Sequence, residues 1–253
     1  MELLPQLRRR ARLLRFHPAQ PRDHRSARHA EPLVPRLLGL PVSLYLQAHP
    51  SRPAALGSDR VGSMALGRDM LQVGCAHGPG GASDPGLTLP ETRTHFYAWV
   101  IVSSPLTLSH NVNDPVISER VWPIIANTEA LAVSEAYFGH SGTMYKGSEE
   151  KVVLTDAAID ADPADDLVPV SVSAGQYFYK QMSHDGSITA VLAMNANTAT
   201  TSMTVDFTEI PGVKGTKFTV RDINAHKDLG SFTGKWTGDV EGHDVAFLLL
   251  TAA

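Results

Sequence analysis

The stretch QYFYKQMSHDGSITAVLAMN, residues 176–195, decides the fold of the C-terminal part of this chain. Two runs rich in aromatic and β-branched residues, 176–183 and 187–195, flank the dipeptide Asp185-Gly186. Such side chains favour strands, and glycine adopts the positive φ angle that a two-residue hairpin turn requires. The pattern therefore predicts two antiparallel strands joined by a tight turn.

Further short runs of the same character surround this hairpin. They are separated by turn residues and read VPVSVSAG (168–175), TSMTVDF (201–207), KFTVRD (217–222) and DVAFLLLTA (244–252). Short strands at this spacing are typical of an antiparallel sandwich. We place a domain boundary near Ser141 and expect residues 141–253 to form an antiparallel β-sandwich domain, because a segment of about 110 residues is long enough to own a core.

The preceding segment, residues 61–140, carries helical signals on both sides of one strand-length run. In chain order they are the capping-box pair Thr88 and Glu91, the run PLTLSHN (105–111), the helix start Asp114-Pro115, an interruption at Pro123, and the helical run IIANTEALAVSEAY (124–137). Helix, strand and helix in this order indicate a piece of an α/β fold. In such folds, side chains at the C-terminal end of a strand face the functional site.

Residues 1–60 have a different chemistry from the rest of the chain. They carry eleven arginines against four acidic residues, and their prolines break every helical or strand period. We assign no fold to this segment and interpret it as disordered or as translation of a wrongly predicted exon. The alternative is a basic arm that binds phosphate backbones. We expect that the chain does not bind nucleic acid.

Composition excludes several classes of protein. Cys75 is the single cysteine, so an internal disulfide and a cysteine-based zinc site are excluded, and no two histidines stand four residues apart. No run reaches the roughly 18 apolar residues of a membrane helix, and no signal peptide is visible. The acidic residues between 156 and 166 lack the spacing of a calcium loop. We expect no metal, no cofactor and no membrane partner, and we assign no compartment.

Six segments together resemble the C-terminal half of a known enzyme family. They are RDMLQVG (68–74), THFYAWVIVSSPLTLSHNVND (94–114), IIANTEALAVSEAY (124–137), GSITAVLAMNAN (186–197), TVRDINAHKDLGSFTG (219–234) and EGHDVAFLLL (241–250). The family is that of the retaining α-galactosidases and α-N-acetylgalactosaminidases. The resemblance implies that residues 61–140 are the last two βα units of an incomplete (β/α)8 barrel, followed by the family's C-terminal β-sandwich.

The resemblance also implies a chemistry, which is the retaining hydrolysis of terminal α-galactosides. That reaction uses two carboxylates about 5 to 5.5 Å apart, a nucleophile and an acid/base. Neither of the family's two catalytic motifs is found before Asp69, so no catalytic residue is assigned and the chain as written is expected to be inactive alone. The expected partner is a galactoside-containing carbohydrate, and the oligomeric state stays open.

Asp69 and Met70 are the two residues to which the resemblance gives a substrate-binding role. A carboxylate at the matching position accepts hydrogen bonds from sugar hydroxyls at the barrel mouth. Just upstream, positions 65–68 read Ala-Leu-Gly-Arg where the family has Trp-Asn-Asp-Pro. His110 and Asn111 follow the predicted strand and could line the sugar pocket, although we favour hydrogen bonding that ties the barrel rim.

The remaining candidates are interpreted as packing residues. We expect His95, Trp99 and Trp122 to pack on helical apolar stripes and Cys75 to be buried. The alternative function is a non-catalytic β-sandwich module that contacts carbohydrate or protein. Tyr177 and Tyr179 alternate on one predicted strand and could stack on sugars, but we favour their packing as one half-buried face of a sheet.

Overall fold

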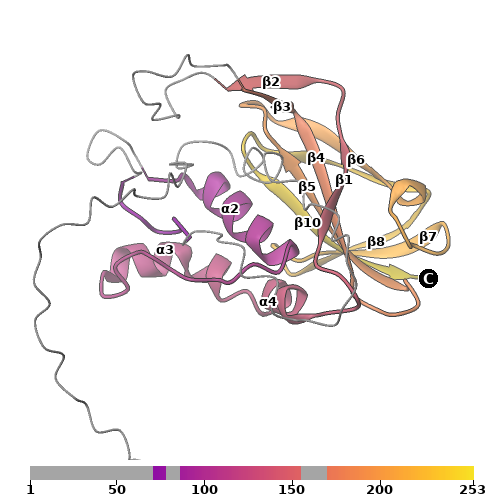
Figure 1. Ribbon diagram of the computed structural model, residues 1–253, viewed down its shortest axis with the longest axis horizontal. Helices are drawn as coiled ribbons and strands as arrows, with labels where there is room; N and C mark the ends of the chain where they lie inside the picture. Colours follow the sequence, from indigo (N-terminus) through magenta and orange to yellow (C-terminus); the bar gives the residue numbers. More distant parts are fainter. Residues whose placement is uncertain (1–70, 78–85, 155–169) are drawn as a thin grey trace, which may run out of the picture. The chain divides into compact units, whose positions relative to one another are not determined.

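A computed structural model describes residues 71–77, 86–154 and 170–253 of this chain (Figure 1). All of these residues fall within one compact unit. The predictions for residues 1–60, for Asp69 and Met70, and for most of the acidic run lie outside the described residues. The described α-helices precede the strands along the chain, and a short 3-10 helix, η3 (Phe207–Glu209), follows β6. No described helix has both the length and the apolar character needed to cross a membrane.

Three helices come first, and a side chain caps the start of each. They are α2 (Leu89–Ile101), α3 (Pro115–Ile125) and α4 (Thr128–Glu135). The predicted capping box of α2 is confirmed, because Thr88 and Glu91 bind each other's backbone N–H groups. Asp114 caps α3, which has Pro115 in its first turn, and Asn127 caps α4.

The break between α3 and α4 does not lie at Pro123, where the sequence predicted it. Pro123 is inside α3, which continues to Ile125. A proline has no N–H to donate to the carbonyl four residues earlier, yet this helix continues for two residues beyond it. The break lies where the Asn127 side chain accepts hydrogen bonds from the backbone N–H groups of Glu129 and Ala130, both at 3.1 Å.

Ten strands follow the helices in the described part of the chain. They are β1 (Thr143–Gly147), β2 (Lys151–Leu154), β3 (Val170–Ser173), β4 (Gly175–Gln181), β5 (Ile188–Asn195), β6 (Thr201–Asp206), β7 (Lys217–Asp222), β8 (Lys227–Thr233), β9 (Lys235–Val240) and β10 (Val245–Ala252). Six form one sheet in the order β1-β4-β5-β10-β7-β8, and β2-β3 and β6-β9 form two-stranded sheets. Every pairing between these strands is antiparallel, as predicted.

The predicted hairpin is confirmed, but its turn is longer than two residues. β4 and β5 pair from Gly175 opposite Asn195 to Gln181 opposite Thr189. Between them the Gly186 N–H donates to the Ser183 carbonyl at 3.4 Å, and Gly186 has φ +74°. Asp185 closes the loop by accepting from the Ser187 N–H at 3.0 Å. The dipeptide therefore marks the hairpin correctly but ends a wider loop.

Gly186→Ala should lower the free energy of unfolding by about 2 kcal/mol. A β-carbon there would strain the positive φ angle and would lie 2.3 Å from the Gly212 carbonyl oxygen. Gly234→Ala is the matched control, because Gly234 has φ +78° and no atom within 4 Å of the added carbon. It should cost about 1 kcal/mol. Urea unfolding of both variants measures the difference, and equal losses would show that the Gly212 contact is harmless.

The six-stranded sheet is covered on both of its faces. One face carries Phe178, Leu192 and Phe247, which pack with α2 and α4 in a core shared between helices and strands. The other face carries Val191 and Leu248, which pack against β6 and β9 in a core made of strand residues and their loops. This explains why β5 and β10 read as continuous apolar runs, since alternation is lost in a strand that is buried on both sides.

The predicted fold class is therefore supported for its all-β part. The described chain is mostly antiparallel sheet with few helices, and its sheets pack face to face as a sandwich. The incomplete barrel and the domain boundary near Ser141 stay predictions.

Candidate functional site

The candidate site lies where the segment that precedes α2 in the chain pairs in parallel with the segment that follows it. Leu71 and Leu108 form a parallel bridge, in which the Leu71 N–H donates to the Thr107 carbonyl at 2.8 Å. Parallel segments need a crossover connection, and α2 lies in that crossover. In open and closed α/β folds, functional side chains gather at the carboxyl ends of such segments.

The polar residues at these carboxyl ends are Cys75, Ser109, His110 and Asn111. The Ser109 hydroxyl donates to the Leu71 carbonyl and lies 3.5 Å from the Cys75 sulfur. Ser109 therefore supplies a side-chain hydrogen bond between the two segments, the role that the sequence predicts for His110 and Asn111. A serine after a short apolar run gives no signal for this role, because its partner is a backbone carbonyl.

His110 is buried beside the turn after Leu71. A β-carbon on Gly74 would lie 2.9 Å from Cγ of His110, and Gly74 has φ +78°, so only glycine fits there. Within the described residues the His110 Nδ1 atom has no hydrogen-bond partner. Asn111 is exposed, and its side-chain oxygen accepts from the Asn113 N–H at 3.1 Å, which shapes the turn into α3.

The packing interpretation holds for His95 and Trp99 but is wrong for two other residues. His95 and Trp99 are buried with ring centroids 4.4 Å apart, and burial lowers the pKa of His95 to about 4, so its Nε2 accepts from the Gln72 N–H. Trp122 is 62% exposed, because α3 buries Val121 on its inner side. Cys75 is only half-buried, since it lies at the outer end of its segment.

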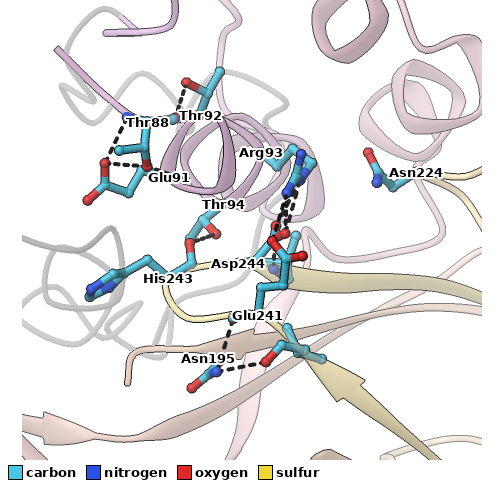
Figure 2. A network of polar contacts seen from close by, with 12 residues as sticks. Thr88, Glu91, Thr92, Arg93, Thr94, Asn195, Asn224, Glu241, His243 and Asp244 are labelled. Atoms are coloured by element: carbon cyan, nitrogen blue, oxygen red, sulfur yellow. Dashed lines mark hydrogen bonds and ion pairs between the residues drawn. The ribbon is translucent and has the colours of Figure 1, made fainter. Parts of the chain in front are cut away.

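Helix α2 is fixed to the strands by a polar network at the turn before β10. Arg93 binds the Asp244 carboxylate through both Nε and Nη2, and Glu241 lies 3.9 Å from the same guanidinium. The Thr94 hydroxyl donates to the His243 carbonyl at 2.7 Å. Figure 2 shows Arg93 pointing from the helix onto Asp244, with Glu241 beside it. The network sets the orientation of α2 on the sheet.

Helix α4 is fixed to the strands at both of its ends. At its start, Glu129 accepts from Arg221 at 2.7 and 2.8 Å and lies 2.8 Å from Nδ1 of His226; the hydrogen bonds from Arg221 lower the pKa of Glu129 to about 2. At its end, the fully buried Lys180 of β4 donates to the carbonyls of Val133 and Ser134. These contacts hold helices and strands in one body.

The predicted substrate-binding residues are Asp69 and Met70. Asp69 and Met70 lie outside the described residues, which begin at Leu71. In the part of the chain that the structure describes, no three histidine, cysteine or acidic side chains gather as a metal site would require. Tyr177 is 8% exposed and packs in the strand core, as the packing interpretation expected.

Comparison with known proteins supports the β-sandwich fold. Residues 173–250 match the family described as the α-galactosidase C-terminal β-sandwich domain. The resemblance to the C-terminal part of the α-galactosidase family is confirmed. An α-galactosidase of Cyamopsis tetragonoloba is 22% identical over 182 residues, and a probable α-galactosidase B of Penicillium simplicissimum is 27% identical over 187 residues.

This chain spans less than half of the length of the α-galactosidases that it matches. The alignments cover 69% and 73% of this chain but only 38% and 37% of the two relatives. Among solved structures, α-galactosidase I of Mortierella vinacea matches 73% of this chain and 40% of its own, with a TM-score of 0.52 and 22% identity. A β-L-arabinopyranosidase of Geobacillus stearothermophilus matches with a TM-score of 0.55 and 19% identity. Both likenesses show the fold.

Proposed function

We propose that this chain supplies the C-terminal part of a retaining glycoside hydrolase of the α-galactosidase kind, with residues 61–140 as the last two βα units of its barrel. The observation that carries the proposal is the parallel bridge between Leu71 and Leu108 with α2 in the crossover. A strand, a helix and a parallel strand are the repeating unit of such a barrel. The matched β-sandwich, which the family description calls C-terminal, follows these segments in the chain.

The proposed substrate is a terminal α-galactoside, and the proposed ligands are Asp69 and Met70. Asp69 stands two residues before Leu71 in the sequence, and Leu71 is the residue that pairs with Leu108. A carboxylate there would accept hydrogen bonds from two sugar hydroxyls at once. It would bind the substrate and would not attack it, because the reaction needs a separate nucleophile and a separate acid/base.

The 253-residue chain alone should show no α-galactosidase turnover. Positioned acid, base and nucleophile groups supply much of the rate enhancement of such enzymes, and binding by Asp69 without them does not accelerate the reaction. The measurement is release of the aryl group from an aryl α-galactoside by the purified chain, against a blank without protein and with Asp69→Asn in parallel. Turnover above the blank that Asp69→Asn abolishes would sink this part of the proposal.

The alternative, a non-catalytic β-sandwich that stacks Tyr177 and Tyr179 on sugars, has less support. Tyr177 is buried against β6 and β9, so its ring face is occupied by protein. Tyr179 is half-buried and touches Tyr145 and His140. A sugar platform made of this pair is therefore not proposed.

A further inference from the structure

Helix α3 carries apolar side chains on two of its sides. On the inner side, Val121 and Ile124 are at most 4% exposed and pack in the core that α2 shares with the strands. On the outer side, Val116 is 75% exposed and Trp122 is 62% exposed. An open hollow of about 270 Å³ on this side is lined by Ser118, Glu119, Trp122 and Pro123. Val116, Trp122 and the hollow are called the α3 face below. A helix with apolar residues on two sides is normally covered on both.

The parallel bridge next to α3 is also incompletely covered. A β-carbon on Gly74 would lie 2.9 Å from Cγ of His110 and 3.0 Å from Cγ2 of Ile117, so α3 begins beside the ends of the bridged segments. Leu108, one of the two bridged residues, is 37% exposed. Within the described residues, Leu71 and Leu108 pair in parallel only with each other. Strands of parallel sheets are usually covered on both faces, so this one lacks neighbours.

Exposed large apolar residues are concentrated in this part of the chain. Of the eight in the described residues, five lie between residues 89 and 122: Leu89, Leu108, Val112, Val116 and Trp122. The Ser118 hydroxyl donates to the Val112 carbonyl at 3.2 Å, which holds the segment after the bridge against α3. Single exposed apolar residues are normal on a protein surface, but their concentration on neighbouring elements indicates an interaction surface.

The lengths of the relatives indicate what covers this surface. More than half of each of the two α-galactosidases lies outside its match to this chain. That part precedes the match, because the matched β-sandwich is described as C-terminal. A barrel closes by pairing its last strand with its first. If residues 61–140 are the last two βα units, the first unit of the barrel would place a strand beside Leu108 and a helix beside α3.

A second copy of this chain fits the α3 face less well. Glu119 lines the hollow and lies between Val116 and Trp122 in the helix. In a two-fold contact the centre of a surface meets its own copy, so two Glu119 carboxylates would face each other. Like charges placed together in an interface cost several kcal/mol, about as much as the apolar contact of so short a helix would contribute.

We propose that the α3 face and the edge at Leu108 bind a second polypeptide, which carries the preceding βα units of the same barrel. One helix of this partner covers Val116 and Trp122, and one of its strands pairs in parallel with the backbone next to Leu108. The inference rests on the proposed function and extends it by naming the partner and the surface that receives it.

The test is co-expression of the full tagged chain with a separate polypeptide, the part of each of the two relatives that precedes its matched segment. Purification of the chain should recover this fragment in one complex on size exclusion. Val116→Ala/Trp122→Ala should lower the recovery at least about tenfold, because loss of a central aromatic anchor weakens interfaces by that much. Trp122→Phe keeps a ring and should retain most of the recovery.

The matched control is Tyr137→Ala/Val153→Ala. It removes one ring and one valine of similar exposure, 61% and 56%, from outside the α3 face, and it should leave the recovery unchanged. Cooperative melting of each variant shows that it is folded. Release of the aryl group from an aryl α-galactoside is a separate readout: a complex without turnover contradicts the proposed hydrolase function and still supports the interface.

Three outcomes overturn the inference. In the first, neither fragment is recovered with the native chain. In the second, loss of Val116 and Trp122 lowers the recovery no more than loss of Tyr137 and Val153. In the third, sedimentation shows that the chain alone is a dimer and that Val116→Ala/Trp122→Ala makes it a monomer, since a second copy then occupies the α3 face.

Discussion

Replacing Lys180 with methionine should lower the free energy of unfolding by about 3 kcal/mol at pH 7. The Lys180 side chain is fully buried, and its Nζ donates to the Ser103 hydroxyl at 2.6 Å, to the Ser134 carbonyl at 3.1 Å and to the Val133 carbonyl. The two carbonyls belong to the last turn of α4, where a cation also offsets the helix dipole. Methionine keeps the volume but leaves these acceptors without a donor.

Lys146→Met is the control for this experiment. Lys146 lies on the adjacent strand β1 and forms an ion pair in which both side chains are more than a third exposed, 37% and 44%. Such a pair contributes at most about 1 kcal/mol. Guanidinium unfolding of both variants measures the difference. Similar losses would mean that Lys180 is no more important to the fold than an exposed lysine.

The same lysine gives the stability a defined pH dependence. Burial lowers the pKa of Lys180 from 10.5 to about 8 in the folded chain. Between these two values the unfolded chain binds the proton more tightly than the folded chain, so unfolding becomes less favourable as the pH rises. The native chain should therefore gain stability relative to Lys180→Met between pH 8 and 10.5, by on the order of 3 kcal/mol. A constant difference across this window would contradict the assignment.

Arg93→Met should lower the free energy of unfolding by about 3 to 4 kcal/mol. The Arg93 guanidinium makes two hydrogen bonds to Asp244 by Nε, at 2.9 and 3.1 Å, and a third by Nη2. The Asp244 side chain is 11% exposed, so loss of the arginine leaves a mostly buried carboxylate without its cation. Because this pair fixes α2 to the turn before β10, the variant should also loosen the helix (Figure 2).

The matched control removes the outer partner of the same arginine. Glu241 is 71% exposed and lies 3.9 Å from Arg93, so Glu241→Gln should cost less than about 1 kcal/mol. In a double-mutant cycle, Arg93→Met and Asp244→Leu together should destabilise the chain less than the sum of the two single changes, since neither charge is then left unpaired. Additive losses in unfolding free energy would show that the two side chains act independently.

Much of the strand arrangement could be predicted from the sequence, and the attachments between elements could not. Asp185-Gly186 marked the hairpin and Thr88 with Glu91 marked a helix start, because turns and caps depend on residues close together in the chain. Trp122 was assigned wrongly, because helical spacing shows that residues share a face but not which face is covered.

The candidate site also contains residues that the sequence indicates and residues that it does not. Ser109 and Lys180 give no signal in the sequence, since serine and lysine side chains are usually solvated. Their partners are carbonyls distant in sequence. The role of Asp69 rests on resemblance alone.

The six-stranded sheet is packed on both faces, and this determines which segment of the chain can be moved into another protein by recombination. A cut after residue 140 would leave Phe178, Leu192 and Phe247, each at most 2% exposed, facing water where α2 and α4 had been. Exposed apolar patches of that kind promote aggregation. The smallest unit that keeps this core covered is therefore the run from α2 to β10. A gene fusion that kept only the matched residues 173–250 would transfer the sheet without the helices that pack on it.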